Sequence, residues 1–146
     1  MIILKGKGDE VMHETSVYVR FCETDAFGHT NNTSYFYYFE ESRMKFFHEV
    51  MQLEDATEVG MVVARLTCDY LHQTYANDTL IARTSVEKLG TKSLTLRQEV
   101  LRSTDREVVA TGQCTLVCFD NKTQSSIIIP DIVRERLQAH LIQSQI

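Results

Sequence analysis

The chain has 146 residues, a formal net charge of −5 and 43% hydrophobic residues. These values predict one globular domain over residues 1–146 with a sizeable core, and they argue against a general nucleic-acid or anionic-membrane surface. No run of roughly 18 apolar residues is present, so no membrane span is expected, and the apolar start at residues 1–7 is too short for a signal peptide. The sequence therefore predicts a cytoplasmic protein.

The first 22 residues predict a lead-in followed by a strand. Residues 1–13 contain two glycines and several charges, and they are consistent with either a flexible segment or a short edge strand. From Thr15 to Cys22, Val17 and Val19 alternate with other residue types, as in a strand with one buried face.

A polar loop follows, within the stretch RFCETDAFGHTNNTSYFYYFEESR at residues 20–43. It carries an acid, Asp25, then Gly28, His29 and the two asparagines Asn31 and Asn32. A carboxylate beside the free amides of a helix start can attack and polarise a carbonyl group. These residue types therefore suggest acyl chemistry.

A long helix is expected after the loop. Asn31 or Asn32 can cap a helix that begins near Thr33 and ends near Met51, because a short side-chain acceptor satisfies an otherwise unpaired amide. Apolar residues then recur at spacings of three and four, which predicts a buried aromatic face: Phe36, Phe39, Phe46, Phe47 and Val50, with Tyr35 beside them.

Four further strands and a short helix complete the predicted elements. The strands are indicated by alternating apolar residues over 62–70, 80–89, 94–100 and 108–118. Their connecting turns are too short for crossovers, so the strands must be antiparallel. Pro130 falls where the last helix can start, with Val133 and Leu137 on its apolar face. The predicted fold class is α+β, one curved antiparallel sheet packed on an aromatic helix.

The four cysteines lie in strand-like runs and are expected to be buried free thiols: Cys22, Cys68, Cys114 and Cys118. Cys114 and Cys118 would share one strand face but lie roughly 13 Å apart, which is too far for a disulfide. The histidines have no metal-ligand spacing, so no metal site is expected. No function is assigned to His13, His48, His72 or His140.

The segment ETDAFGHTNN at residues 23–32, followed by Tyr35 and EESR at 40–43, resembles the signature of the 4-hydroxybenzoyl-CoA thioesterase family of hotdog-fold acyl-CoA thioesterases. The resemblance covers roughly residues 15–137. It continues through CDYL at 68–71, YAND at 75–78, VEKLGTKSL at 86–94 and VVATG at 108–112.

This resemblance implies a hotdog fold, in which a five-stranded antiparallel sheet wraps a long central helix. It also implies that two protomers pair into a continuous ten-stranded sheet, giving a homodimer or homotetramer. The active sites would lie between subunits, with the pantetheine arm of coenzyme A running between them. No metal or organic cofactor would be needed for hydrolysis of the acyl-CoA substrate.

The resemblance also assigns roles to residues of the loop and helix. Asp25 matches the catalytic aspartate, which acts as nucleophile or as general base on water. Asn32 matches the helix-start position whose backbone N–H faces the thioester oxygen, and His29 would order a water or hydrogen-bond Asp25. Gly28 would allow close backbone approach or a positive φ. Tyr35 is expected to contact the substrate.

The anionic end of coenzyme A is expected at the hairpin that carries Thr91, Lys92 and Ser93, where charge-assisted hydrogen bonds can reach phosphate oxygens. Two other functions stay open at this point, a hotdog hydratase or dehydratase acting on the acyl chain and a non-catalytic acyl-CoA binding module. The sequence does not decide the acyl group, the choice between coenzyme A and acyl-carrier protein, or the choice between dimer and tetramer.

Overall fold

The computed structural model describes residues 12–52 and 60–142. It therefore leaves residues 1–11 of the predicted lead-in outside the described part of the chain. The elements in chain order are β1 (His13–Tyr18), the short 3-10 helix η1 (Phe21–Glu23), α1 (Asn32–Met51), β2 (Gly60–Tyr70), β3 (Thr79–Leu89), β4 (Ser93–Arg102), β5 (Val108–Asp120), β6 (Ser125–Ser126) and α2 (Asp131–Gln138). The predicted order of strand, long helix, four strands and short helix is confirmed.

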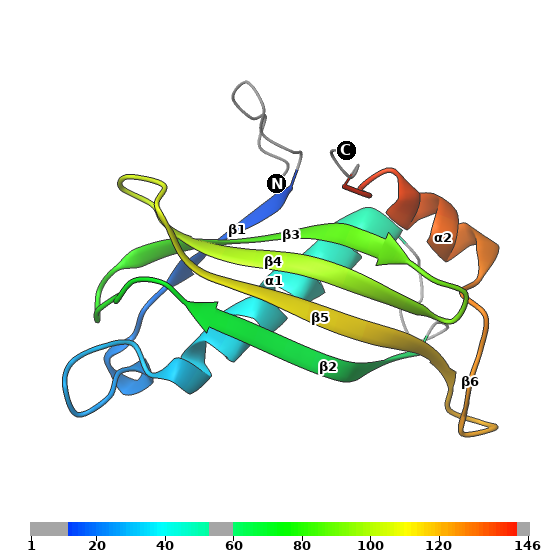
Figure 1. Cartoon of the computed structure of the whole chain (residues 1–146), viewed down its shortest axis with the longest axis horizontal. Coiled ribbons are helices and arrows are strands. Elements are labelled where there is room, and N and C mark those ends of the chain that lie inside the picture. The colour runs from blue at the N-terminus through cyan, green and yellow to red at the C-terminus, as the bar shows by residue number, and fades with distance from the viewer. Residues whose placement is uncertain (1–11, 53–59, 143–146) are drawn as a thin grey trace.

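The five long strands form one antiparallel sheet in the order β1-β3-β4-β5-β2, and the two-residue β6 pairs with β5. Helix α1 lies across one face of the sheet, and α2 lies at the end where β3 turns into β4 (Figure 1). This is the predicted hotdog arrangement of a curved sheet around a central helix. None of the helices in the described ranges is long and apolar enough to cross a bilayer.

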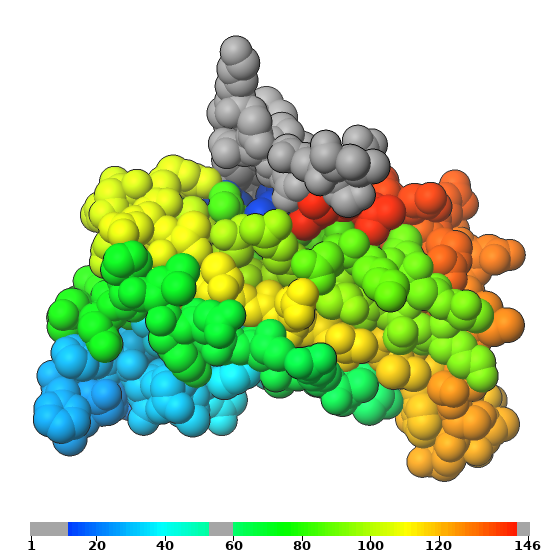
Figure 2. All heavy atoms as spheres, in the orientation of Figure 1, coloured from blue at the N-terminus to red at the C-terminus, as the bar shows by residue number. Residues whose placement is uncertain are grey.

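Strand β2 forms one edge of the sheet and pairs only with β5 among the described strands. In Figure 2 it runs along the lower margin of the visible face, between the loop that precedes α1 and the β5–β6 turn. Its apolar side chains are 39 to 46% exposed at Val62, Val63, Leu66 and Tyr70. A long apolar edge of this kind is a surface on which another strand can pair.

The start of α1 follows from its cap. The side-chain oxygen of Asn31 accepts hydrogen bonds from the backbone N–H of Thr33 at 3.0 Å and from its hydroxyl at 2.9 Å. Asn32 is the first helical residue, and the helix ends at Met51, where Gln52 turns left-handed with φ 48°. Both predicted helix ends are therefore confirmed to within one residue.

The aromatic face of α1 packs into two clusters of buried side chains. One gathers around Phe46 and the other around Phe39 and Tyr35. Phe36 and Phe47 are only partly buried, whereas Tyr38, which was not assigned to the stripe, is buried. The difference arises because the sheet curves around the helix and covers a wider arc than one strict stripe.

Polar side chains inside the core also fix α1 to the sheet. The Ser42 and Thr84 hydroxyls lie 2.7 Å apart, and Gln98 Nε2 donates to Thr84 Oγ1 at 2.8 Å and to the Phe39 carbonyl at 2.9 Å. Arg43 Nη1 donates to Gln98 Oε1 at 3.1 Å. These directional bonds specify how the helix is rotated on the sheet, and so where its first turn lies.

The prediction that the first strand continues to Cys22 is wrong. Strand β1 ends at Tyr18, because Glu23 turns back onto Arg20, accepting from its backbone N–H at 2.8 Å and from Nη2 at 3.0 Å. The 3-10 turn leaves Cys22 exposed, so the expectation of a buried thiol fails there.

The other three cysteines lie in strands. Cys68 is half-buried, while Cys114 and Cys118 are buried, and burial raises the pKa of all three thiols. All four cysteines are free, as predicted.

The predicted alternation of β2 is interrupted by an irregularity between Val63 and Arg65.

Candidate active site

Asp25 anchors the loop that precedes α1. Its Oδ1 accepts hydrogen bonds from the backbone N–H groups of Phe27 at 2.9 Å and His29 at 3.1 Å. The backbone closes the same turn, since Asp25 N–H donates to the His29 carbonyl at 2.7 Å and Gly28 N–H donates to the Asp25 carbonyl at 3.0 Å. Gly28 has φ +79°, a conformation that favours glycine. Asp25 is therefore held by its own loop.

The loop is attached to the connection between β2 and β3. Thr30 N–H donates to the Thr74 carbonyl at 2.8 Å, and the two threonine hydroxyls lie 2.6 Å apart. The Tyr35 hydroxyl lies 2.8 Å from Thr74 Oγ1, and burial raises the pKa of Tyr35. The His29 ring packs against Tyr75 with 5.4 Å between ring centroids. The loop and the first turn of α1 are thus positioned by one shared residue, Thr74.

The loop, the first turn of α1 and the end of β2 enclose a cavity of about 270 Å³. Four residues that the sequence singled out share this cavity, namely Asp25, His29, Asn32 and Tyr35, whereas Gly28 shapes the loop without lining it. A larger cavity of about 630 Å³ lies between β1 and α1, and neither Asp25 nor Asn32 lines it. The smaller cavity is the one that the predicted catalytic residues line, and its lining comprises Asp25, His29, Thr30, Asn32, Tyr35, Tyr70, Leu71, His72 and Gln73.

Asp25 and the first residue of α1 both keep unused hydrogen-bonding capacity at this cavity. Asp25 Oδ2 accepts no hydrogen bond from any described residue, while Oδ1 is occupied by the loop. At the helix start, the Asn31 side chain takes the Thr33 N–H and the Asn31 carbonyl takes the Ser34 N–H at 2.9 Å. Within the same described ranges the Asn32 N–H has no acceptor. A carboxylate oxygen and a helix amide without partners therefore belong to two residues that line one cavity.

Tyr70 connects the helix start to the edge strand. Its hydroxyl donates to the Asn32 carbonyl at 2.8 Å, and its ring lies edge-on to Tyr35 with 5.3 Å between centroids. Burial raises the pKa of Tyr70 to about 12, so the hydroxyl keeps its proton at neutral pH and stays a donor. Sequence reasoning placed Tyr70 on a strand and did not assign it to the site. The available signals were an aromatic residue at the strand's end and its place in the CDYL segment of the family resemblance.

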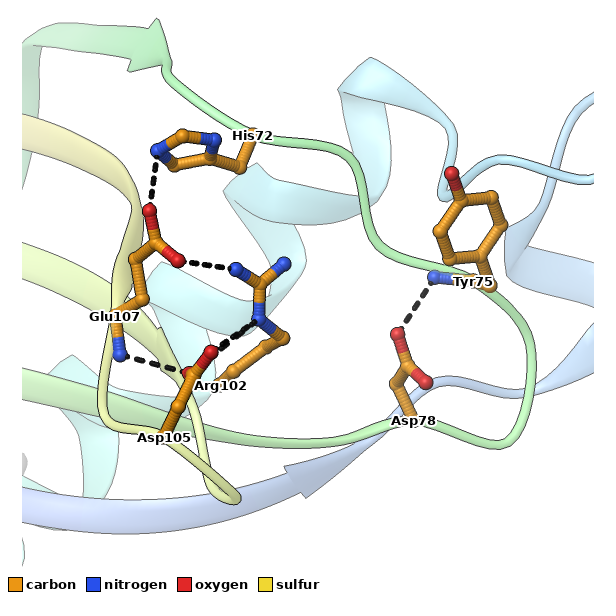
Figure 3. Close-up of polar contacts among 6 residues, drawn as sticks. All are labelled: His72, Tyr75, Asp78, Arg102, Asp105 and Glu107. Carbon is orange, nitrogen blue, oxygen red and sulfur yellow. Dashed lines mark hydrogen bonds and ion pairs between the residues drawn. The ribbon is translucent and has the colours of Figure 1, made fainter.

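His72 is a second site residue that sequence reasoning missed. It follows β2, lines the same cavity as Asp25, and contacts Glu107 of the β4–β5 turn with 2.8 Å between Nε2 and Oε1 (Figure 3). Nothing in the sequence placed residue 107 beside residue 72.

The structure does not bring Thr91, Lys92 and Ser93 to this cavity within one chain. Ser93 pairs with Val117 of β5, whereas Tyr70 pairs with Ala110 of the same strand. The seven residue steps from 110 to 117 span about 23 Å at 3.3 Å per step. The hairpin between β3 and β4 accordingly lies at the opposite end of the sheet from the loop before α1 (Figure 1).

Among residues 12–52 and 60–142, no three His, Cys, Asp or Glu side chains gather in a way that could hold a metal ion. The cavity is lined by one acid, Asp25, and two histidines, His29 and His72.

Comparison with known proteins matches residues 19–137 to the family model described as the thioesterase-like superfamily. The chain is 33% identical over 121 residues to the uncharacterised protein YsmA of Bacillus subtilis, covering 83% of this chain and 82% of that protein. It is 28% identical over 127 residues to the long-chain acyl-CoA thioesterase FadM of Escherichia coli, covering 86% of this chain and 96% of that protein.

A solved structure has the same architecture. The predicted thioesterase from Bacillus stearothermophilus superposes with a TM-score of 0.82 and 31% sequence identity, covering 92% of this chain and 99% of that one. The hotdog fold expected from the sequence is thereby confirmed.

Proposed function

We propose that this chain, which belongs to the thioesterase-like superfamily and is a thioester hydrolase, converts an acyl-CoA to a free carboxylic acid and coenzyme A. The observation that carries the proposal is the pair of unused groups in one cavity, Asp25 Oδ2 and the Asn32 N–H. The name of FadM, a long-chain acyl-CoA thioesterase, supports coenzyme A as the carrier. Membership of the specific 4-hydroxybenzoyl-CoA thioesterase family and the cytoplasmic location stay predictions from the sequence.

The two groups would act on opposite sides of one carbonyl. The Asn32 N–H would receive the oxygen as it gains negative charge, an interaction for which a single donor contributes about 3–4 kcal/mol of barrier. Asp25 Oδ2 would attack the carbonyl carbon or take a proton from an attacking water. The two hydrogen bonds to Oδ1 hold the carboxylate in one orientation during either route. Both routes end with cleavage of the C–S bond.

We further propose that the working form is a homo-oligomer in which two β2 edges pair. The edge is eleven residues long and exposes large apolar side chains, and a partner strand would cover those of Val63 and Leu66. Two identical strands paired antiparallel place the Gly60 end of one beside the Tyr70 end of the other. The partner's hairpin of residues 91–93 would then approach the cavity that contains Asp25. This pairing accounts for the 23 Å or so that separates the two predicted halves of the site in one chain.

The proposed reaction is tested by free-thiol release from a panel of acyl-CoAs with short, long and aryl acyl groups, including the 4-hydroxybenzoyl thioester. We expect turnover of one class well above the others, because a pocket of defined depth discriminates acyl groups. The favoured acyl group is then offered on acyl-carrier protein as a control for the carrier. Absence of thiol release from every acyl-CoA would show that the proposed substrate class is wrong.

The proposed pairing is tested by Leu66→Asp, which places a carboxylate on the edge and opposes it to a like charge across a two-fold axis. We expect the variant to elute as a monomer and to lose at least about tenfold in hydrolysis, the scale of 1.4 kcal/mol. Leu66→Val is the matched control and should keep both the oligomer and the rate. A parent protein that is monomeric and fully active at working concentration would contradict the pairing.

A further inference from the structure

His72 is held at the cavity wall by a chain of charged side chains from the β4–β5 turn (Figure 3). Glu107 Oε1 lies 2.8 Å from His72 Nε2, and Glu107 Oε2 accepts from Arg102 Nη2 at 2.6 Å. Asp105 lies 3.4 Å from Arg102 Nε and accepts the Glu107 backbone N–H at 3.0 Å. Glu107, Arg102 and Asp105 are therefore each fixed by at least two contacts.

The backbone of this segment is fixed as well. The N–H groups of Leu71 and His72 both donate to the Val109 carbonyl, at 2.8 and 3.2 Å. Residues 71 and 72 thus extend the pairing between β2 and β5 beyond the last residue of β2. A histidine at this point has a defined backbone position and a defined ring contact, although its side chain is half exposed.

The arrangement matches the way a carboxylate prepares a histidine for proton transfer. A carboxylate that contacts one ring nitrogen fixes the orientation of the ring. It also lies beside the positive charge that the ring carries when both nitrogens are protonated. The other ring nitrogen then stays available for the reaction. In His72, Nε2 contacts Glu107, and Nδ1 has no partner among the described residues. His72 therefore has one nitrogen committed and one available.

His29, the other histidine of the cavity, lacks this preparation. Its ring contacts are aromatic, with Phe27 at 6.4 Å and Tyr75 at 5.4 Å between centroids, and within the described ranges no carboxylate contacts its ring. The remaining titratable groups that line the cavity are Asp25 on the loop and the Tyr35 and Tyr70 hydroxyls, and both hydroxyls are engaged in hydrogen bonds. Of these groups, only His72 combines a proton-carrying side chain with a carboxylate support.

We propose that His72 is the general acid that protonates the leaving sulfur, an inference that rests on the thioester hydrolysis proposed above. As the tetrahedral intermediate collapses, the C–S bond breaks, its electron pair moves to sulfur, and sulfur takes the proton from His72 Nδ1. Where Asp25 takes a proton from the attacking water, that proton passes on to the imidazole; where Asp25 is the nucleophile, the water that hydrolyses the acyl group returns a proton to the imidazole. The balance is thioester plus water giving carboxylic acid plus thiol, with Asp25 and His72 restored.

The experiment compares two thioesters of one acyl group, the acyl-CoA and the ester of thiophenol. An aromatic thiolate is a better leaving group than the alkyl thiolate of coenzyme A and does not require a proton in the transition state. For His72→Gln, which keeps a hydrogen bond to Glu107, we expect a loss of about 100-fold or more on the acyl-CoA, the usual scale of general acid catalysis. On the thiophenol thioester, the hydrolysis rate of the same variant should fall by less than about threefold, or 0.6 kcal/mol of barrier.

Two variants control the comparison. His48→Gln changes an exposed histidine of α1 outside the cavity and should match the parent on both esters. Glu107→Gln should lower the hydrolysis rate on the acyl-CoA by about tenfold and leave the rate on the thiophenol thioester nearly unchanged. It serves as the test if His72→Gln does not keep the parent's thermal melt. Equal losses on both esters, or no loss on either, would overturn the assignment. A parent that hydrolyses no thioester would instead refute the proposed function itself.

Discussion

Asp25→Asn is expected to lower kcat for thioester hydrolysis by at least about a hundredfold, near 2.7 kcal/mol of barrier. The substitution keeps an oxygen that can accept from the N–H groups of Phe27 and His29, so the loop turn is retained. It removes the negative charge and the nucleophilic character of the second oxygen. The loss should therefore appear in kcat measured by free-thiol release, with little change in the thermal melt.

The matched control is Asp120→Asn. Asp120 Oδ1 accepts the Lys122 N–H at 2.9 Å in a similar turn at the other end of the sheet, and its loss of charge should leave kcat within about twofold, 0.4 kcal/mol. If Asp25→Asn retained more than a tenth of the parent rate, Asp25 would be only a turn residue. Coenzyme A titration of the variant would distinguish lost chemistry from lost binding.

Phe46→Ala is expected to lower the free energy of unfolding by about 3–5 kcal/mol, because a fully buried aromatic ring leaves a cavity that the core refills only in part. Phe46 is 0% exposed and belongs to the core cluster that joins α1, the sheet and α2. Its ring centroid lies 5.9 Å from that of His13 and 5.5 Å from that of His140. Phe46 is the least exposed aromatic ring of α1.

Denaturant unfolding of the variant should be measured at about pH 7.5, above the ordinary pKa of histidine. Burial lowers the pKa of both His13 and His140 in the folded protein, so their imidazole rings bind protons more readily in the unfolded chain. The free energy of unfolding therefore falls as the pH drops below about 6.5. Phe21→Ala, at a ring that is 84% exposed, is the control and should change stability by less than about 0.5 kcal/mol. A loss below about 1 kcal/mol for Phe46→Ala would mean that the cluster is not the core described above.

Local physical chemistry explains the parts of the fold that were predictable. The cap at Asn31 and the apolar spacing along α1 involve residues within a few positions of one another, and both helix ends followed from them. The antiparallel sheet followed from turns too short to cross over. Asp25 and Asn32 lie seven residues apart in one loop and helix start, so their presence in one cavity also depended on nearby sequence.

Two errors in the predicted strands have causes that lie within a few residues of the error. Alternation predicted a strand through Cys22, but a side-chain acceptor three residues ahead of Arg20 stabilised a 3-10 turn instead. The irregularity in β2 between Val63 and Arg65 likewise left no mark in the apolar pattern. Hydrophobic alternation reports which face is buried and does not report competing side-chain to backbone hydrogen bonds.

By itself, the sequence determined the α+β class, the element order and the pairing of a carboxylate with a helix amide. Only the tertiary structure decided that Tyr70 and His72 join that pair and that residues 91–93 lie at the far end of the sheet. The reason is that these relations depend on strand order and register. In the order β1-β3-β4-β5-β2, strand β2 pairs with β5, although β3 and β4 separate them in the chain. This pairing sets residue 107, just before β5, beside residue 72, just after β2. Such contacts join positions tens of residues apart, and no local interaction in the sequence encodes them.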